Sequence, residues 1–461
     1  MRNAKCGRLA RYADESHVRS NYQQEPAHKH SAFRIPHSAF LFIATLILAC
    51  WVGNLIIKQF IASSLLAAGE LSESSALALT YAPANPHVQV AYGKHLLYQA
   101  DLPRAAEGLA ALERATAASP HDYRFWLELA RGYENDNQTA PAERAYEQAR
   151  ALAPRYFETH WAIANFYLRG GRTEESLREF RVALELSGES AGATDTHAAL
   201  NAYEAVSQAF GLNLQALRQI APADAHAQAA LAQYLAEHQA LDPALETWRA
   251  LLPEAQNNSR EALASLLAAT QQTGRYQDAR ALWRTFVLHT GALDWPPQNL
   301  IYNGGFEREL ITDPAGFDWQ PVTHSEVFLR RDDMQARAGR YTLRLTFAAQ
   351  MKSELQGPAQ LIAVEPNTAY RLRFFAKTAK VPDRAPFVEI TDAARPQLFA
   401  VRAPVPSGTN EWREVALTFT TPAETHALRL TIRAPQLLEV NTGHIAEVWL
   451  DEFRLEQSAA Q

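Results

Sequence analysis

Two pairs of neighbouring carboxylates are the residues whose types would best suit hydrolytic chemistry. Asp332 is followed directly by Asp333, and Glu307 lies two residues before Glu309. Hydrolysis of a glycosidic bond needs two carboxyl groups across a substrate cleft, one as the acid and the other as the nucleophile or base. Residues this close on one loop or strand do not provide that arrangement. The pairs therefore do not predict a glycosidase, and we expect the chain not to be an enzyme.

Histidine and cysteine residues offer little metal or redox chemistry. His28 and His30 lie in a polar N-terminal stretch, and two histidines without acidic or thiol partners rarely hold a metal ion. We therefore expect this stretch to be a disordered tail. Cys6 and Cys50 are the two cysteines, so no disulfide can link the region after residue 60. That region must be held together by burial, which suits large repeat and β domains.

Length and composition favour a multidomain chain that does not bind nucleic acid. A chain of 461 residues predicts two or three domains. Apolar residues make up 47% of the sequence and charged residues 20%, so most of the chain can bury a core. The net charge is −6 and there is no long basic block. Because nucleic-acid binding requires neutralisation of phosphates, we expect no such partner.

An uncharged apolar stretch near the N-terminus predicts a membrane anchor. Residues 39–57 carry no charge, and a bilayer is spanned by ~20 such residues. The preceding tail is rich in Arg and Lys, so the positive-inside rule places it in the cytoplasm. We expect a disordered cytoplasmic tail at 1–36 and a single transmembrane signal anchor at 37–60, in a bacterial inner membrane with the bulk of the chain periplasmic. A cleavable signal peptide is disfavoured by the long polar lead.

A regular spacing of prolines and aromatic residues predicts helical repeats between residues 61 and 290. Pro86, Pro120 and Pro154 recur every 34 residues. Apolar residues between Pro120 and Pro154 follow the i, i+3, i+4 and i+7 spacing of two short helices. A helix–turn–helix unit of this length has the tetratricopeptide period. The region resembles a tetratricopeptide-repeat solenoid.

This resemblance implies a concave surface that binds protein partners. In the family, certain positions of each first helix line that surface. The matching residues are Arg124, Leu127, Arg131, Glu134, Glu158, Trp161, Asn165 and Leu168. Trp161 either faces the groove, where it would suit a peptide or glycan, or packs between adjacent units. No nucleophile, base and orienting group converge here, so we expect no catalysis in this region.

The chain changes character after a segment that interrupts the helical period. Residues 291–298 are predicted to form a linker. Beyond them, apolar and polar residues alternate in short segments that are separated by Pro, Gly and Asn clusters. The segments are 340–347, 369–378, 414–421, 426–433 and 446–456. This alternation predicts an all-β sandwich or jelly roll.

The landmarks of residues 299–457 resemble carbohydrate-binding modules of the galactose-binding-like jelly-roll type. NLIYNGGFE opens the segment and VWLDEFRLE closes it. The resemblance implies polysaccharide binding, although this fold also serves in protein interaction and in purely structural roles. Aromatic side chains that would stack on sugar rings are Trp319, Phe399, Trp449 and Tyr302. Polar side chains that would meet the hydroxyls are Arg402, Gln397 and Asn410.

The same resemblance implies a structural calcium ion between the opening Glu and the closing Asp. The matching residues are Glu307 and Asp451. Carboxylate oxygens together with loop carbonyls are the ligands that Ca²⁺ requires. Alternatively, both side chains are solvated or paired with Arg308 or Arg454. We expect no other cofactor.

Together these patterns predict an N-terminal transmembrane helix, an all-α tetratricopeptide solenoid and an all-β jelly-roll sandwich. We expect a non-enzymatic scaffold that binds protein partners through the solenoid and polysaccharide through the jelly roll, in cell-envelope or exopolysaccharide assembly. Two alternatives stay open. The chain is a pure protein-interaction adaptor with a structural jelly roll, or it is an accessory subunit of a polysaccharide-processing enzyme.

Overall fold

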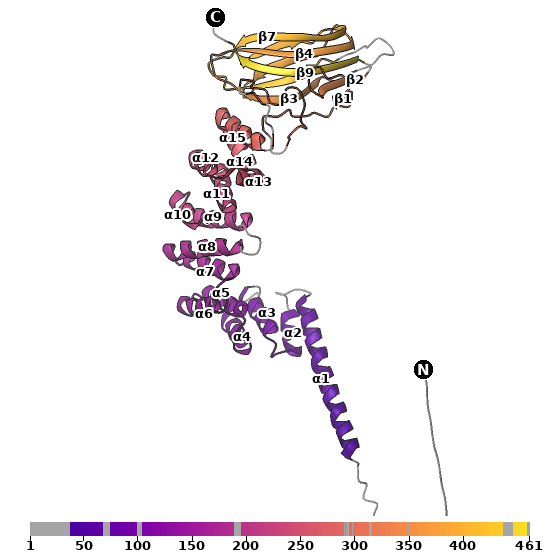
Figure 1. Cartoon of the computed structure of the whole chain (residues 1–461). Coiled ribbons are helices and arrows are strands. Elements are labelled where there is room, and N and C mark those ends of the chain that lie inside the picture. Colours follow the sequence, from indigo (N-terminus) through magenta and orange to yellow (C-terminus); the bar gives the residue numbers. More distant parts are fainter. Residues whose placement is uncertain are drawn as a thin grey trace, which may run out of the picture. The chain divides into compact units, whose positions relative to one another are not determined.

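The chain consists of helices followed by strands (Figure 1). The computed structural model describes residues 37–67, 74–98, 104–188, 195–289, 291, 295–296, 298–312, 316–348, 351–436 and 446–458. These residues form two compact units, which divide between Pro103 and Arg104. The predicted tail at 1–36, with His28 and His30, lies outside the described residues.

The first unit begins with a long apolar helix, α1 (His37–Ala67). This helix is long and apolar enough to cross a membrane, with a mean hydropathy of 2.0 over residues 41–67. It runs beyond residue 60, where the sequence analysis ended the anchor. Its last turns pack on α2 (Ser74–Tyr81) and α3 (Pro86–Tyr98) through a small core that includes Ala62 and Ala78.

The helices of the second unit form successive antiparallel hairpins. They are α4 (Ala105–Ala118), α5 (Tyr123–Asn135), α6 (Thr139–Leu152), α7 (Phe157–Arg169), α8 (Thr173–Ser187), α9 (Thr196–Phe210), α10 (Leu214–Ile220), α11 (Ala225–Glu237), α12 (Leu241–Arg249), α13 (Pro253–Asn258), α14 (Arg260–Gln272) and α15 (Tyr276–His289). The turns inside four hairpins each hold a residue with left-handed φ, between 59° and 75°. These residues are Asn137, Gly171, Gln239 and Gly274. Their spacing confirms the predicted helical repeats.

Short polar side chains define where several of these helices begin. Asp122 precedes α5 and accepts a hydrogen bond from the N–H of Arg124 at 3.1 Å. Asp224 does the same for α11, accepting from the N–H of Ala227 at 3.1 Å. Such caps satisfy backbone donors that have no partner inside the helix, and each stabilises its helix by ~1 kcal/mol.

The strands form two antiparallel sheets packed face to face. The strands are β1 (Val327–Asp332), β2 (Thr342–Phe347), β3 (Leu355–Ala363), β4 (Ala369–Val381), β5 (Phe387–Asp392), β6 (Ala400–Pro404), β7 (Gly408–Thr420), β8 (Ala427–Ala434) and β9 (Ala446–Gln457). One sheet has the order β1-β2-β9-β4-β7 and the other β3-β8-β5-β6. Alternate side chains such as Phe374 and Leu430 are fully buried between them. The predicted all-β sandwich is confirmed.

The last helices and the sandwich share one continuous apolar core. Trp283 of α15 is fully buried and meets the ring of Tyr302 edge-on, at 6.2 Å between centroids. Trp295 packs on the same tyrosine at 5.2 Å. Phe317 and Ala363 of the sandwich belong to the same cluster. Part of the predicted linker therefore contributes a core side chain.

Candidate functional site

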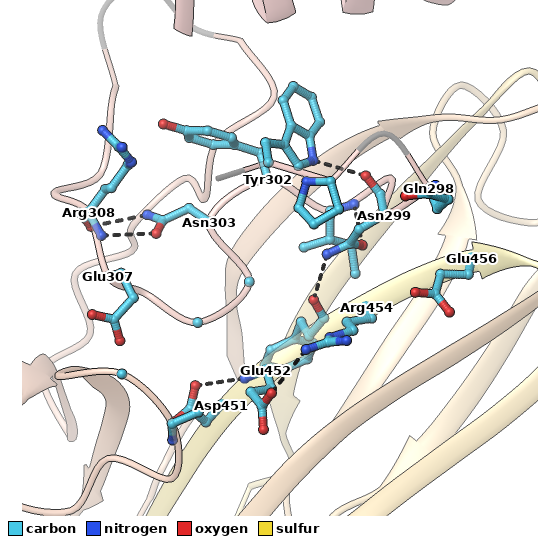
Figure 2. A pocket seen from close by; sticks show the side chains of 18 residues that line it. Gln298, Asn299, Tyr302, Asn303, Glu307, Arg308, Asp451, Glu452, Arg454 and Glu456 are labelled. Carbon is cyan, nitrogen blue, oxygen red and sulfur yellow. Dashed lines mark hydrogen bonds and ion pairs between the residues drawn. The ribbon is translucent and has the colours of Figure 1, made fainter. Parts of the chain in front are cut away.

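A hollow of about 730 Å³ lies between the opening loop of the sandwich and strand β9 (Figure 2). Polar side chains dominate the part of its lining that Figure 2 labels, including Glu307, Arg308, Glu452 and Arg454. Asp451 also lines it. The two predicted calcium ligands, which are far apart in the sequence, therefore border one space.

Both of these carboxylates accept hydrogen bonds from backbone amides. The N–H of Arg340 donates to both oxygens of Glu307, at 2.9 and 3.0 Å. Asp451 accepts from the N–H of Arg337 at 2.9 Å and from that of Glu452 at 2.7 Å. Burial nevertheless raises the pKa of Asp451 to about 6. Its negative charge is thus incompletely compensated by the protein.

Glu307 and Asp451 supply some, but not all, of the ligands that a calcium ion requires. A Cβ built on Gly305 would stand 3.6 Å from Oδ1 of Asp451 and 3.8 Å from Cγ of Glu307, so both side chains flank this glycine. A cation between them would stabilise the partly desolvated carboxylate of Asp451. No three His, Cys, Asp or Glu side chains cluster as metal ligands within the described ranges. Backbone carbonyls or water would have to complete the coordination that Ca²⁺ requires.

Three of the four aromatic residues predicted to bind sugar are buried. Trp319 is fully buried against Phe306 and Phe453, with ring centroids 5.2 and 5.1 Å away. Tyr302 is 2% exposed and Trp449 6% exposed. A ring cannot stack on a sugar while neighbouring side chains cover it. The burial of Trp319 and Tyr302 therefore does not support a sugar-binding role for either ring. Both rings instead pack in the core.

The remaining predicted sugar-binding residues do not converge. Phe399 is half-buried and Gln397 is exposed, both in the turn between β5 and β6. Arg402 on β6 donates to the carboxylate of Glu389 at 2.8 Å. Asn410 belongs to β7, which is part of the other sheet. Although these residues are close in sequence, their side chains do not form one site.

Several predicted groove residues of the repeats are engaged within the chain. Arg131 forms an ion pair with a glutamate on its own helix at 2.8 Å. Glu134 is paired with Arg169 of α7 at 2.6 Å. Leu127 is 4% exposed and belongs to the core. Asn165 donates to a backbone carbonyl of its own helix at 2.8 Å. Of these contacts, the ion pair between Glu134 and Arg169 joins two helices, whereas those of Arg131 and Asn165 stay within one helix.

Arg124, Glu158 and Trp161 border hollows at the N-terminal ends of α5 and α7. Arg124 lines a hollow of about 690 Å³, and the other two line one of about 800 Å³. Trp161 stacks on Phe157 at 5.4 Å and meets Phe180 edge-on at 5.3 Å. Each of the two interpretations of Trp161 therefore holds in part, because the indole both packs and borders open space.

Two tyrosines that the sequence analysis missed connect these hollows. The rings of Tyr123 and Tyr156 lie 5.0 Å apart, and Tyr156 is 53% exposed. Tyr156 lines both hollows. We call Tyr123, Tyr156, Phe157 and Trp161 the aromatic ledge. The signal in the sequence was the recurrence of an aromatic residue 34 positions apart, Tyr123 and Phe157, three residues after each repeat proline.

The outer face of the five-stranded sheet was also missed, although one of its residues had been predicted. Trp449 lies there between Arg344 and Lys377, which are its partners on β2 and β4. The guanidinium of Arg344 lies 5.4 Å from the centroid of the indole. The indole N–H donates to Asp332 at 2.9 Å. Charged side chains therefore cover this ring on a face that points away from the core.

A second aromatic ring lies on the same face. Phe375 on β4 is half-buried, and its neighbours Phe374 and Ala376 point into the core. The guanidinium of Arg337 lies 3.4 Å from the centroid of Phe375. Helix α15 packs against β3, which belongs to the other sheet. The outer face thus combines two rings with many hydrogen-bonding groups.

Comparison with protein families assigns part of the chain. Residues 298–438 match the model of a family described as a carbohydrate binding domain. A search of curated proteins found no match.

Solved structures that are similar to each part share little sequence with it. A Family 16 Carbohydrate Binding Module-2 is 19% identical, over 34% of this chain and 99% of that chain, with a TM-score of 0.25. The CBM22-1 xylan-binding domain from Paenibacillus barcinonensis is 16% identical, over 34% and 94%, with a TM-score of 0.23. A thermophilic TPR protein of Thermus thermophilus is 21% identical, over 32% and 79%, with a TM-score of 0.28. At these TM-scores we carry no site or ligand over.

The chain combines three structural features. Its N-terminal helix is long and apolar enough to cross a membrane. Its helical hairpins repeat with the tetratricopeptide period, and its C-terminal strands form a two-sheet sandwich. Domains of these two kinds are typically binding domains rather than catalytic ones. The chain therefore joins tetratricopeptide-like repeats to a C-terminal segment, residues 298–438, that matches the carbohydrate binding domain family.

Proposed function

We propose that the chain is a non-enzymatic scaffold, anchored in a bacterial inner membrane by α1, with its bulk in the periplasm. Its sandwich binds polysaccharide and its helical repeats bind protein partners, in cell-envelope or exopolysaccharide assembly. The observation that carries this proposal is the outer face of the five-stranded sheet, of which β1, β2, β4 and β7 lie within the segment that matches a carbohydrate-binding family.

The chemistry of this face suits a sugar. A sugar ring has an apolar C–H face and a rim of hydroxyls, so it is bound by an aromatic ring flanked by donors and acceptors. Phe375 supplies a half-buried ring, which a sugar would reach by displacing the guanidinium of Arg337, and Lys377 lies on the same face. Lys377 is paired with the exposed Glu411 at 2.9 Å. Such surface pairs contribute ~0–1 kcal/mol, so hydroxyl groups can replace them at little cost.

The glycan proposal is tested on the full chain in detergent micelles with an array of bacterial and plant polysaccharides. Replacement of Phe375 by Ala is expected to weaken binding at least about tenfold, which corresponds to the loss of one aromatic contact of ~1.4 kcal/mol. Met334→Ala is the matched control, because Met334 is 79% exposed in the loop after β1. If the wild-type chain binds no glycan, the proposal fails and the protein-interaction adaptor becomes the better description.

We also propose that Glu307 and Asp451 bind calcium. Adding Ca²⁺ to EGTA-treated protein is expected to raise the melting temperature of the sandwich by several degrees. A ligand at 100 times its Kd stabilises the folded state by about 2.7 kcal/mol, and here the cation would offset the burial of the Asp451 charge. Differential scanning calorimetry measures the shift.

Two variants control the calcium experiment. Asp451→Asn should abolish the shift, because it removes a charged ligand while keeping the shape of the side chain. Glu309→Gln should retain the shift, because Glu309 is an exposed carboxylate close to Glu307. A melting temperature of the wild-type chain that is the same with Ca²⁺ and with EGTA would rule out a structural calcium ion.

A further inference from the structure

The aromatic ledge contains a tyrosine where helix stability favours a different residue. Asp122 caps α5, and the equivalent position 34 residues later is Tyr156, immediately before α7. No side chain caps α7 there. Asp or Asn at such a position stabilises a helix, whereas tyrosine offers no acceptor for the backbone donors. A ring that is 53% exposed also gains little from packing.

The space around Tyr156 has the size of a ligand site. The hollow at residues 118–124 measures about 690 Å³, and the neighbouring hollow at Trp161 measures about 800 Å³. Small-molecule sites typically measure ~300–1,000 Å³. Because Tyr156 borders both hollows, it forms a ridge over which a chain-like ligand can pass.

Polar groups on the ledge are available to such a ligand. Within the described ranges, no hydrogen bond of the chain engages the hydroxyls of Tyr123 and Tyr156 or the indole N–H of Trp161. The carboxylate of Glu158 is exposed and forms no ion pair in the same part of the chain. The ledge therefore offers two hydroxyls that can donate or accept, one N–H donor and one carboxylate acceptor beside its rings.

The charges around the ledge are of both signs, since Arg155 and Asp195 also line the hollow at Trp161, and this mixture favours a neutral ligand. The guanidinium of Arg124 is held by both oxygens of Asp122, at 2.9 and 2.6 Å, so it offers little attraction to an anion. Glu158 would repel an anion directly. A peptide could not extend a sheet here, because helices present no strand edge with free backbone groups, so it would have to bind through its side chains alone. Flat rings with hydroxyl, indole and carboxylate groups suit a hydroxyl-rich chain instead.

We propose that the aromatic ledge is a second glycan site, on the helical repeats, which takes a neutral oligosaccharide. The proposal rests on the proposed glycan binding of the chain and adds a separate surface to it. Two sites on one chain raise the overall affinity for a long polysaccharide, because the second contact forms at a high effective concentration.

Three variants of the full chain in detergent test the ledge. Titration calorimetry with neutral cello-, xylo- and manno-oligosaccharides is the measurement. Tyr156→Asn restores a cap and should weaken binding at least about tenfold. Its melting temperature should not fall below that of the wild type, because the new cap offsets the lost contact with Tyr123. Tyr156→Leu should also lose binding, since it keeps apolar bulk but no flat ring.

The control is Tyr81→Asn, because Tyr81 is 37% exposed and lies on α2, away from the ledge in sequence. It should bind like the wild type. The ledge proposal is overturned if Tyr156→Asn and Tyr156→Leu bind every oligosaccharide normally, or if Tyr156→Leu alone retains binding. In that case Phe375→Ala still reports on the sandwich site, so failure of the ledge is separate from failure of the proposed function. A wild-type chain that binds no glycan overturns both.

Discussion

Replacement of Gly304 by Ala is expected to destabilise the sandwich by more than about 3 kcal/mol, because backbone atoms must move to make room. A Cβ at this position would stand 2.2 Å from the carbonyl oxygen of Phe453. Phe453 lies on β9 beside Arg454, which pairs with Arg373 of β4, and its carbonyl accepts a hydrogen bond from the side chain of Asn299 at 3.2 Å, so its backbone has little freedom to shift. Its N–H also donates to the carbonyl of Gly304 at 2.9 Å.

Thermal unfolding of the full chain in detergent measures this effect, with the transition of the sandwich followed by calorimetry. Gly305→Ala is the matched control. Its nearest neighbour, Oδ1 of Asp451, would lie 3.6 Å from the new Cβ, which is an ordinary contact. We expect this variant to unfold close to the wild type. Equal melting temperatures for the two variants would contradict the close contact between Gly304 and the backbone of Phe453.

Trp283→Ala is expected to cost about 3–5 kcal/mol, the range for a large aromatic side chain removed from a core. Trp283 is fully buried where the helices meet the sandwich. The segment at Gly316 lies directly on the indole, since a Cβ there would approach it to 2.1 Å. Loss of the ring leaves a cavity that neither part can close alone. The repeats and the sandwich should then unfold in separate steps.

Calorimetry distinguishes coupled from separate unfolding of the two parts. Leu288→Ala is the control on the same helix, because Leu288 is 37% exposed and its loss leaves no cavity at the junction. We expect its unfolding profile to match that of the wild type. A Trp283→Ala chain with the same number of transitions and an unchanged melting temperature would contradict the shared core.

The sequence predicted much of the fold because local patterns repeat. Prolines at 34-residue intervals and apolar residues on one face of each helix report burial within a few turns of chain. Most of strand β4 alternates between buried and more exposed residues, and it was predicted for the same reason. The segment from Phe387 to Ala403 is interrupted by a turn at Pro396, and its sequence does not show which face it presents. In the structure it forms the β5–β6 hairpin, whose register depends on β8.

The sites were harder to predict, because exposure of a ring is set by distant residues. Trp449 points away from Val448 and Leu450, as alternation requires, but Arg344 and Asp332 cover it from β2 and β1. Trp319 lies in a loop without a periodic pattern, and its burial follows from contacts with residues such as Phe453. Residue type alone therefore could not separate a sugar platform from a core side chain.

The sequence by itself determined the apolar N-terminal helix, the repeating helical hairpins and the two-sheet sandwich, since each follows from the spacing of apolar residues along the chain. The tertiary structure alone decided that Glu307 and Asp451 border one hollow and that Trp283 joins the repeats to the sandwich. It also decided that Tyr156 stays exposed between two hollows. These relations join residues distant in sequence or depend on how helices stack, and no local pattern encodes them.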